Sequence, residues 1–346
     1  ATRAWPPAAP ATRTLFLGAA GSLATEPRAE PAADAFEHRP TAGMRGGSLC
    51  WGAGHPPNGL ARDLRLEADA GPTWTSEPLA EPLDILGFPV AILHVEATRP
   101  VATLVARLGC VLPDGSIEQV SEGILNLTHR DSHAEPAPLE PGHAYEVRLQ
   151  LRSAGYRFPR GHRIHLGLAS AHWPVHWPSP GAGELTIHHG GDTPSRLELP
   201  LAPGAVGDPA DADAAEPPAF GDPPTLPEIG SETSEPPRWE IVEHDGEGRV
   251  SIHEAATTTL PDGASTLYVS ETIDMAASKR APGTGRFENS CEYRLRSEGH
   301  DIDVVADGTT IAAEKTIDMS VRVRVALDGE PFWERESRDR IARDLL

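Results

Sequence analysis

The sequence predicts an all-β protein with two domains. Glycine (33 residues) and proline (35) are abundant in the 346-residue chain, while aromatic residues make up only 5%. This composition suits short strands joined by turns better than long helices. Apolar and polar side chains also alternate with a period of two in many separate stretches, as they do in strands with one buried face. The chain is long enough for two domains that each bury a core.

The first expected domain covers residues 1–202. A short apolar strand is predicted within 13–20, ended by Gly21, and a turn-rich stretch follows at 22–60. Further strands are predicted where apolar residues alternate, near 83–85, 90–96, 104–108, 117–127, 145–151 and 164–168. Turn residues separate them at Pro113 to Gly115 and at Gly161. Strands at this spacing indicate a sandwich of antiparallel sheets.

A linker and a second domain are expected after residue 202. Residues 203–237 contain eight acidic residues and nine prolines without a periodic apolar face, which is typical of a linker. Alternation then returns strongly, for example from Phe287 to Leu295 and from Ile317 to Leu327. These patterns predict a second antiparallel β-rich domain over 238–346.

The charge of the chain argues against nucleic-acid and membrane partners. Residues 1–200 hold 16 basic and 21 acidic side chains, a balance of −5, and residues 201–346 hold 14 and 30, a balance of −16. Phosphate binding needs clustered cations, and the sequence has no basic cluster. No apolar run approaches the roughly 20 residues of a membrane span.

No complete catalytic or metal site is predicted. A nucleophile elbow needs a G-x-S-x-G-like sequence, and the nearest match, Gly263-Ala264-Ser265, has Leu267 at its last position, so we expect a hairpin there. The pairs His129 with His133 and His172 with His176 have the spacing of zinc ligands on a helix, but they lie in loop contexts. We therefore expect hydrogen-bonded loop histidines. The cysteines Cys50, Cys110 and Cys291 are expected as free thiols, and no cofactor is predicted.

One aromatic loop is the candidate functional segment. It contains His172, Trp173, His176 and Trp177, stiffened by neighbouring prolines. Such rings suit two roles, either lining a sugar or ligand site or packing on a partner domain. We treat these four residues as a candidate interface or pocket wall.

Several motifs, in order, resemble one enzyme family. The stretch 76–87 (SEPLAEPLDILG), the segments 112–116 (LPDGS) and 121–125 (SEGIL), the tetrapeptide 139–142 (LEPG) and the segment 158–164 (FPRGHRI) are similar to the C-terminal region of Xaa-Pro dipeptidyl-peptidase and cocaine-esterase-like hydrolases, the CocE/NonD family. This resemblance implies a galactose-binding-like jelly roll for residues 1–202. Longer members of the family also carry a further C-terminal β region.

The resemblance also implies a partner and a role. In the family, an N-terminal α/β-hydrolase domain carries the Ser-Asp-His triad, and no triad residue can be carried over to this sequence. We therefore expect a non-catalytic part of a serine esterase or dipeptidyl-peptidase that caps that domain, shapes its acyl pocket and forms a homo-oligomer, in the cytoplasm. The chain begins at Ala1 without Met, which we interpret as the middle of a longer polypeptide. The alternative is a free-standing carbohydrate- or ligand-binding module, because jelly rolls are often lectin-like.

Overall fold

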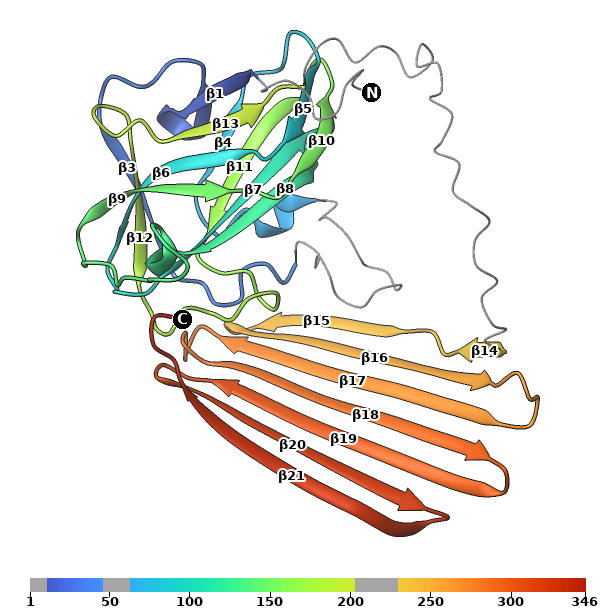
Figure 1. The fold of residues 1–346 in the computed structure, drawn as a ribbon. Coiled ribbons are helices and arrows are strands. Elements are labelled where there is room, and N and C mark those ends of the chain that lie inside the picture. Colours follow the sequence, from blue (N-terminus) through green and yellow to red (C-terminus); the bar gives the residue numbers. More distant parts are fainter. Residues whose placement is uncertain (1–10, 46–62, 203–229) are drawn as a thin grey trace. The chain divides into compact units, whose positions relative to one another are not determined.

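A computed structural model describes residues 11–45, 63–202 and 230–346 (Figure 1). It divides into two compact units, which we describe separately: a sandwich unit (residues 1–215 with 345 and 346) and a sheet unit (residues 216–344). The described residues form strands and three short 3-10 helices, and they include no α-helix. The expected all-β class is therefore confirmed. Among these residues, no helix is long and apolar enough to span a bilayer.

The sandwich unit consists of short strands. Their bounds are β1 Thr12–Leu17, β2 Ser22–Ala24, β3 Ala32–Glu37, β4 Thr73–Ser76, β5 Leu83–Gly87, β6 Val90–Ala97, β7 Thr103–Val111, β8 Ile117–Asn126, β9 Ala144–Gln150, β10 Ala154–Phe158, β11 Arg163–Ala169, β12 Glu184–His189 and β13 Arg196–Pro200. The 3-10 helices are η1 Ala19–Gly21, η2 Leu64–Glu67 and η3 Leu127–His129.

The strands of the sandwich unit enclose one apolar core. The main sheet has the order β3-β12-β6-β13-β1-β2-β4-β11-β7-β8, with β9 also paired to β6, and β5 and β10 form a separate pair. All its pairs are antiparallel except β2 with β4. A single buried cluster takes Leu93 and Val147 from one end of this order and Leu104 and Leu108 from the other. The sheet must therefore fold back on itself, which makes it a sandwich.

One glycine shows how closely the two sides of the sandwich approach. A Cβ atom on Gly123 of β8 would lie 2.5 Å from the carbonyl oxygen of Gln150 and 2.5 Å from Leu149 Cδ2, both in β9. Such distances are shorter than any real contact, so only glycine fits where β8 passes β9.

The predicted strands of this unit agree with the structure, but the pattern missed β2, β3, β4, β10, β12 and β13. The alternating stretches at 117–127, 145–151 and 164–168 form β8, β9 and β11. Strand β10, which lies between β9 and β11, was not predicted. It is short, its apolar content comes from Tyr156 and Phe158, and it pairs with the distant β5.

The sheet unit contains a single antiparallel sheet of long strands (Figure 1). Its strands are β14 Ser231–Ser234, β15 Arg238–His244, β16 Glu247–Thr259, β17 Thr266–Ser278, β18 Gly285–Ser297, β19 His300–Ala312, β20 Thr316–Leu327 and β21 Glu330–Ala342. From β16 to β21 each strand pairs with the next along the chain, while β14 and β15 both pair with β16. The predicted strands around 287–295 and 317–327 are confirmed as parts of β18 and β20.

The expected linker lies largely outside the described residues, which omit 203–229. Its last part is described, and β14 lies there, paired with Thr257 and its neighbours at the end of β16. The expected turn-rich stretch at 22–60 is likewise described only up to residue 45, and Cys50 lies beyond it.

Candidate functional site

The loop after β11 holds the four candidate residues, and one end of it is fixed in the sandwich. His172 and Trp173 are buried, each with 2% of its surface exposed, whereas His176 and Trp177 are half-buried. The Trp173 amide donates to the Ala42 carbonyl at 2.7 Å, and the His176 amide donates to the His172 carbonyl at 2.8 Å. The Trp173–Pro174 peptide bond is cis.

The two indole rings lie together but differ in exposure. Their centroids are 5.5 Å apart, and their planes are inclined by 50°. Replacing Trp173 would destabilise the chain, because its ring is part of the packed interior and its removal would leave a large cavity. Trp177 alone retains the exposure that a partner surface requires.

A buried polar cluster lies beneath this loop. Glu122 of β8 is at its centre, with 1% of its surface exposed. Its Oε2 accepts a hydrogen bond from Gln119 Nε2 at 3.0 Å, and lies 3.5 Å from His172 Nδ1 and 3.9 Å from Arg107 Nε. The cluster thus joins two adjacent strands, β7 and β8, to the aromatic loop.

Burial sets the ionisation of this cluster. Desolvation raises the pKa of the Glu122 carboxyl, although Arg107 and Gln119 counter the effect. Desolvation also lowers the pKa of His172 well below its usual value, and the positive charge of Arg107 adds to this. Burial lowers the pKa of Arg107, while the charges of Glu67 and Glu122 act to raise it. The guanidinium remains protonated in either case. His172 is therefore neutral beside a fixed arginine charge.

A second carboxylate ties the segment after β3 to the same place. Glu67 of η2 accepts hydrogen bonds from the backbone amides of Gly43 at 2.9 Å and Arg45 at 2.7 Å. Gly43 has a positive φ of 100°, and a Cβ atom there would lie 2.5 Å from His172 Cδ2. The loop and this segment are therefore in close contact, and glycine is required between them.

Four buried polar atoms of the cluster have no hydrogen-bond partner among the described residues. They are Arg107 Nη2, Glu122 Oε1, His172 Nδ1 and Trp173 Nε1. Both donors and acceptors are present in this set, which is what an enclosed water molecule requires. The cluster is thus equipped to hold internal water and fix the loop, and its burial keeps it from direct contact with a substrate.

The strands explain why sequence reasoning missed Glu122 and Arg107. Both residues lie in strands with apolar neighbours, so the alternating pattern predicted strands there without marking either residue as part of a site. The available signal was a charged residue inside a run that is buried on both faces, as in β7, where Arg107 stands between Ala106 and Leu108. Charges in such runs are rare unless they are paired.

The other sequence candidates do not assemble into a site. The His129 and His133 rings lie 5.5 Å apart, and the described residues contain no group of three or more metal-ligating side chains. Ser265 is 2% exposed and lies in the hairpin between β16 and β17, where its hydroxyl hydrogen-bonds Asp262 and Ser297. It is therefore a turn residue, as the sequence suggested.

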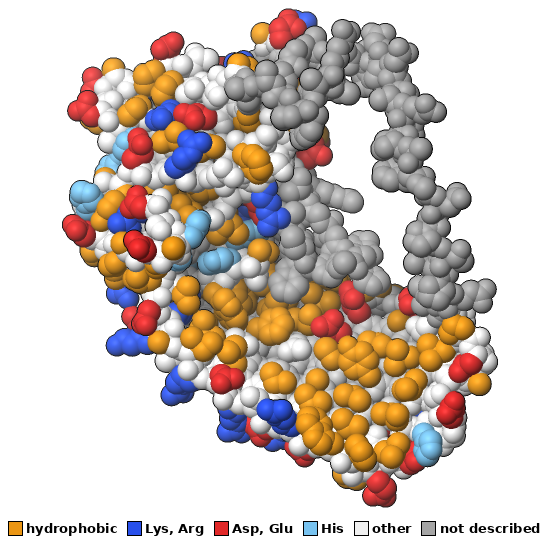
Figure 2. Space-filling view, in the orientation of Figure 1, with side chains coloured by type: hydrophobic (Ala, Val, Ile, Leu, Met, Phe, Trp, Pro, Cys, Tyr) orange, Lys and Arg blue, Asp and Glu red, His pale blue; other side chains and the backbone are white. Residues whose placement is uncertain are grey.

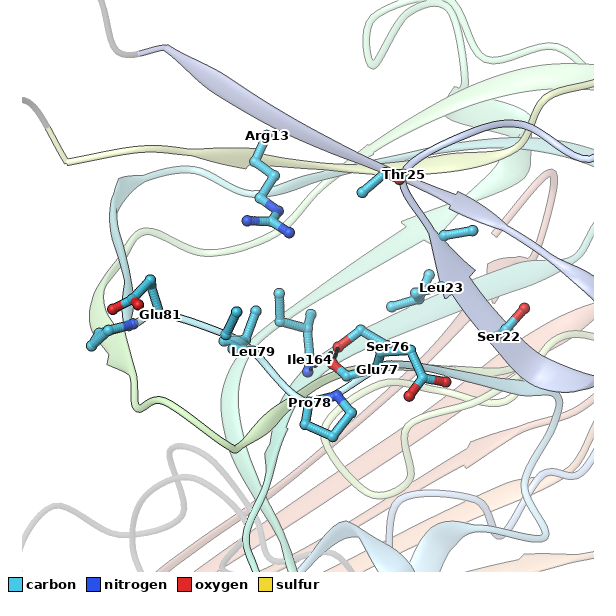
Figure 3. A pocket seen from close by; sticks show the side chains of 13 residues that line it. Arg13, Ser22, Leu23, Thr25, Ser76, Glu77, Pro78, Leu79, Glu81 and Ile164 are labelled. Carbon is cyan, nitrogen blue, oxygen red and sulfur yellow. Dashed lines mark hydrogen bonds between the residues drawn. The ribbon is translucent and has the colours of Figure 1, made fainter.

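The sandwich unit also has a pocket of about 610 Å³. Leu79 and Ile164 form an apolar floor, and Arg13, Glu77 and Glu81 stand around it (Figure 3). No aromatic ring belongs to the described residues that line it. Because sugar sites usually stack the sugar on an aromatic ring, this pocket does not fit the carbohydrate-binding alternative, and the ligand-binding alternative stays a prediction.

Comparison with known proteins gives consistent matches to the first part of the chain. The family model described as "X-Pro dipeptidyl-peptidase C-terminal non-catalytic domain" matches residues 1–198. Cocaine esterase from Rhodococcus sp. (strain MB1 Bresler) is 25% identical over 223 residues, which cover 57% of this chain and 38% of the esterase. The chain therefore corresponds to well under half of the length of that relative.

One of the matching solved structures supports the same fold. The crystal structure of an aminopeptidase from the marine sediment archaeon Thaumarchaeota archaeon superposes with a TM-score of 0.51 at 23% identity, covering 57% of this chain and 38% of that one. A CocE/NonD family hydrolase from Staphylococcus aureus gives a TM-score of 0.43 at 15% identity, with the same two coverages.

Proposed function

Because the chain belongs to the X-Pro dipeptidyl-peptidase C-terminal non-catalytic domain family, we propose that its sandwich unit caps the active site of an α/β-hydrolase domain in the complete protein. Domains of this family normally accompany such a catalytic domain. We further propose that the loop of His172, Trp173, His176 and Trp177 faces that domain through His176 and Trp177, which form part of the wall of its acyl pocket, while His172 and Trp173 anchor the loop from inside.

The observation that carries this proposal is the unequal burial of the two tryptophans. Trp173 is locked in the interior above the Glu122 cluster, while the adjacent Trp177 ring is left half-buried. An aromatic ring offers about 150–250 Å² of surface, and covering it gains roughly 25 cal/mol per Å². A ring that is held rigidly but only partly covered suits a contact with another domain, because little side-chain entropy is lost on binding.

The chemistry itself is assigned to the partner domain. In this chain no serine has glycine at both −2 and +2, so the sequence lacks a nucleophile elbow. An acyl-transfer reaction also needs a general base beside the nucleophile. His172 is unsuited to that role because it is enclosed and no serine hydroxyl is hydrogen-bonded to it among the described contacts. The contribution of this chain is therefore the shape of the site.

The test replaces Trp177 by alanine and measures binding to the hydrolase part of the complete protein, produced separately. We expect Trp177→Ala to weaken the complex by about 2 kcal/mol, close to 30-fold in Kd, as for an interface hot spot. Isothermal titration calorimetry gives the Kd directly. Thermal melting of Trp177→Ala verifies that the sandwich unit stays folded.

Phe88 provides the matched control. It is an aromatic residue of the same unit, in the turn between β5 and β6, and 54% of its surface is exposed. Phe88→Ala should leave the Kd within a factor of two. Equal losses for both variants, or no loss for Trp177→Ala, would contradict the assigned interface.

A further inference from the structure

The sheet unit has one apolar face and one charged face. In register, apolar residues of neighbouring strands lie side by side across β16 to β21, as in the row of Val269, Tyr293, Val304, Val325 and Trp333. The intervening positions point the other way and carry ion pairs, among them Arg249 with Asp274, Arg322 with Glu336 and Arg324 with Asp307. Figure 2 shows hydrophobic side chains gathered over these strands.

The apolar face has no second layer within its own unit. All strands of residues 230–344 belong to one sheet, so no other sheet of that unit covers it. Several large side chains of the face are exposed as a result, including Tyr293, Val321 and Trp333. A contiguous apolar area of this kind marks an interaction surface, because monomeric proteins rarely expose one larger than a few hundred Å².

We propose that this face binds a second copy of the same chain, and that the two sheets pack face to face as a β-sandwich. The family match ends at residue 198, so the sheet unit lies outside the part that family members share. A binding partner shared by the whole family would therefore not explain a surface on the sheet unit. A second copy of this chain always carries an identical sheet, so it is available wherever this surface exists.

The area is sufficient for a stable dimer. Val250 and Met275, at one end of the face, are already buried, which leaves about eight residues in each of the six long strands. With about 3.3 Å per residue and 4.8 Å between strands, this part measures roughly 26 by 29 Å. Two such faces bury about 1,500 Å² in total, within the range of roughly 1,200–2,000 Å² for specific complexes.

Three charges in one row near the middle of the apolar face select one arrangement. Glu254 and Glu271 lie directly opposite each other on β16 and β17, and Arg335 occupies the same row on β21. A two-fold axis along the strands, between β18 and β19, places β21 of one copy over β16 of the other. Arg335 of the second copy then lies above Glu254, one strand away from Glu271, and offsets the repulsion between the two glutamates.

A dimer whose two-fold axis runs perpendicular to the strands is unfavourable. A two-fold axis that runs across the strands through this row would place Glu271 over Glu271 of the second copy. Like charges that face each other in a desolvated interface repel strongly and disfavour this arrangement. The axis along the strands is therefore the expected one, and sheets packed in this way stay aligned to within about 30°.

The first experiment compares two valines of similar exposure on opposite faces of the sheet. Val321 lies on the apolar face and is 48% exposed, and Val242 lies on the charged face and is 43% exposed. Sedimentation equilibrium of the full chain should show a dimer at micromolar concentration. Val321→Lys should weaken it at least 100-fold, because it buries an unpaired charge, whereas Val242→Lys should leave it unchanged.

The second experiment uses charge reversal and does not depend on whether Val321→Lys folds. Arg335→Glu and Glu271→Arg should each raise the dimer Kd about 10-fold or more, and the double variant should restore it to within about threefold. A monomeric wild-type chain at 100 µM would overturn the proposal. So would a dimer that is insensitive to Val321→Lys, a double variant without rescue, or loss of hydrolase-domain binding on Val321→Lys, which would make that domain the occupant.

Discussion

Glu122 illustrates how single residues hold the candidate site together. Its carboxylate is enclosed between strands and lies near the charge of Arg107, with Gln119 as its hydrogen-bond donor. Removing one partner of a buried charge pair leaves the other uncompensated, and that is far more costly than losing an exposed pair. The cluster therefore stabilises the sandwich unit only while both charged partners, Glu122 and Arg107, are present.

Replacing Glu122 by glutamine should destabilise the sandwich unit by about 3 kcal/mol. The change keeps the shape but removes the negative charge beside Arg107, and Glu67 offsets only part of the loss. Urea unfolding measures the effect. Glu77→Gln is the control, because its side chain is 94% exposed and lies 3.6 Å from Arg163, and it should stay within about 0.5 kcal/mol. Equal stability of both variants would contradict the role of the cluster.

His165 should make the sandwich unit sensitive to mild acid. Burial in β11 lowers its pKa to about 4, from 6.5 in the unfolded chain. Because the unfolded state binds the proton more tightly, the stabilisation is present above pH 6.5 and is lost as the pH falls toward 4. The loss from this group between pH 7 and pH 5 is about 2 kcal/mol. His172, whose pKa is also lowered, acts in the same direction.

The measurement is urea unfolding of wild type and His165→Gln at both pH values. The variant should lose about 2 kcal/mol less between pH 7 and pH 5. His300→Gln is the control of opposite sign, because the exposed His300 has its pKa raised by Asp328 and its stabilisation is present at low pH. An unchanged pH dependence in His165→Gln would show that this histidine is not the titrating group.

Two kinds of strand carry out different tasks in the two units. In the sandwich unit, short strands cross closely and both of their faces meet other residues, so β7 is buried along nearly its whole length. In the sheet unit, long strands have one apolar and one charged face, and almost all their residues are half-buried or exposed. The first kind builds a core within the chain, and the second presents a surface.

Replacing Gly123 by alanine tests the close approach of β8 and β9. The new methyl group would meet the Gln150 carbonyl, a backbone atom that cannot move aside, so we expect a loss of about 1–3 kcal/mol. Gly155→Ala in β10 is the control, because its Cβ would make only an ordinary contact of 3.6 Å with Leu86. Thermal melting of both variants measures the difference, and a tolerated Gly123→Ala would imply that the two strands separate easily.

For the whole molecule, the distribution of charge agrees with the proposed assembly. Residues 201–346 carry a balance of −16, with 14 basic and 30 acidic side chains. In the sheet unit many of these charges lie on the face opposite the apolar one, where ion pairs such as Arg294 with Glu292 and Arg296 with Asp303 are partly exposed to solvent. A strongly charged outer face keeps an assembly soluble, while the inner face remains free to associate.

The sequence by itself determined the strands that alternate clearly, because a period of two is a local property that few residues suffice to reveal. The all-β class and the strands β8, β9, β11, β18 and β20 followed from it, and the family resemblance followed from short motifs. Strand β10 was missed because its stability comes from pairing with β5, about 70 residues earlier, and not from its own pattern.

Only the tertiary structure decided which side chains meet. Glu122 and Arg107 come together with His172 because β7 and β8 pair in one register and the loop after β11 returns above them. The different burial of Trp173 and Trp177 likewise depends on contacts with Ala42, about 130 residues away. Strand alternation showed that β16 to β21 each have an apolar side, but their pairing in a single sheet decided that these sides form one continuous face with no second layer among the described residues of that unit. Register and burial are set by long-range contacts, and these are not encoded in any local stretch of sequence.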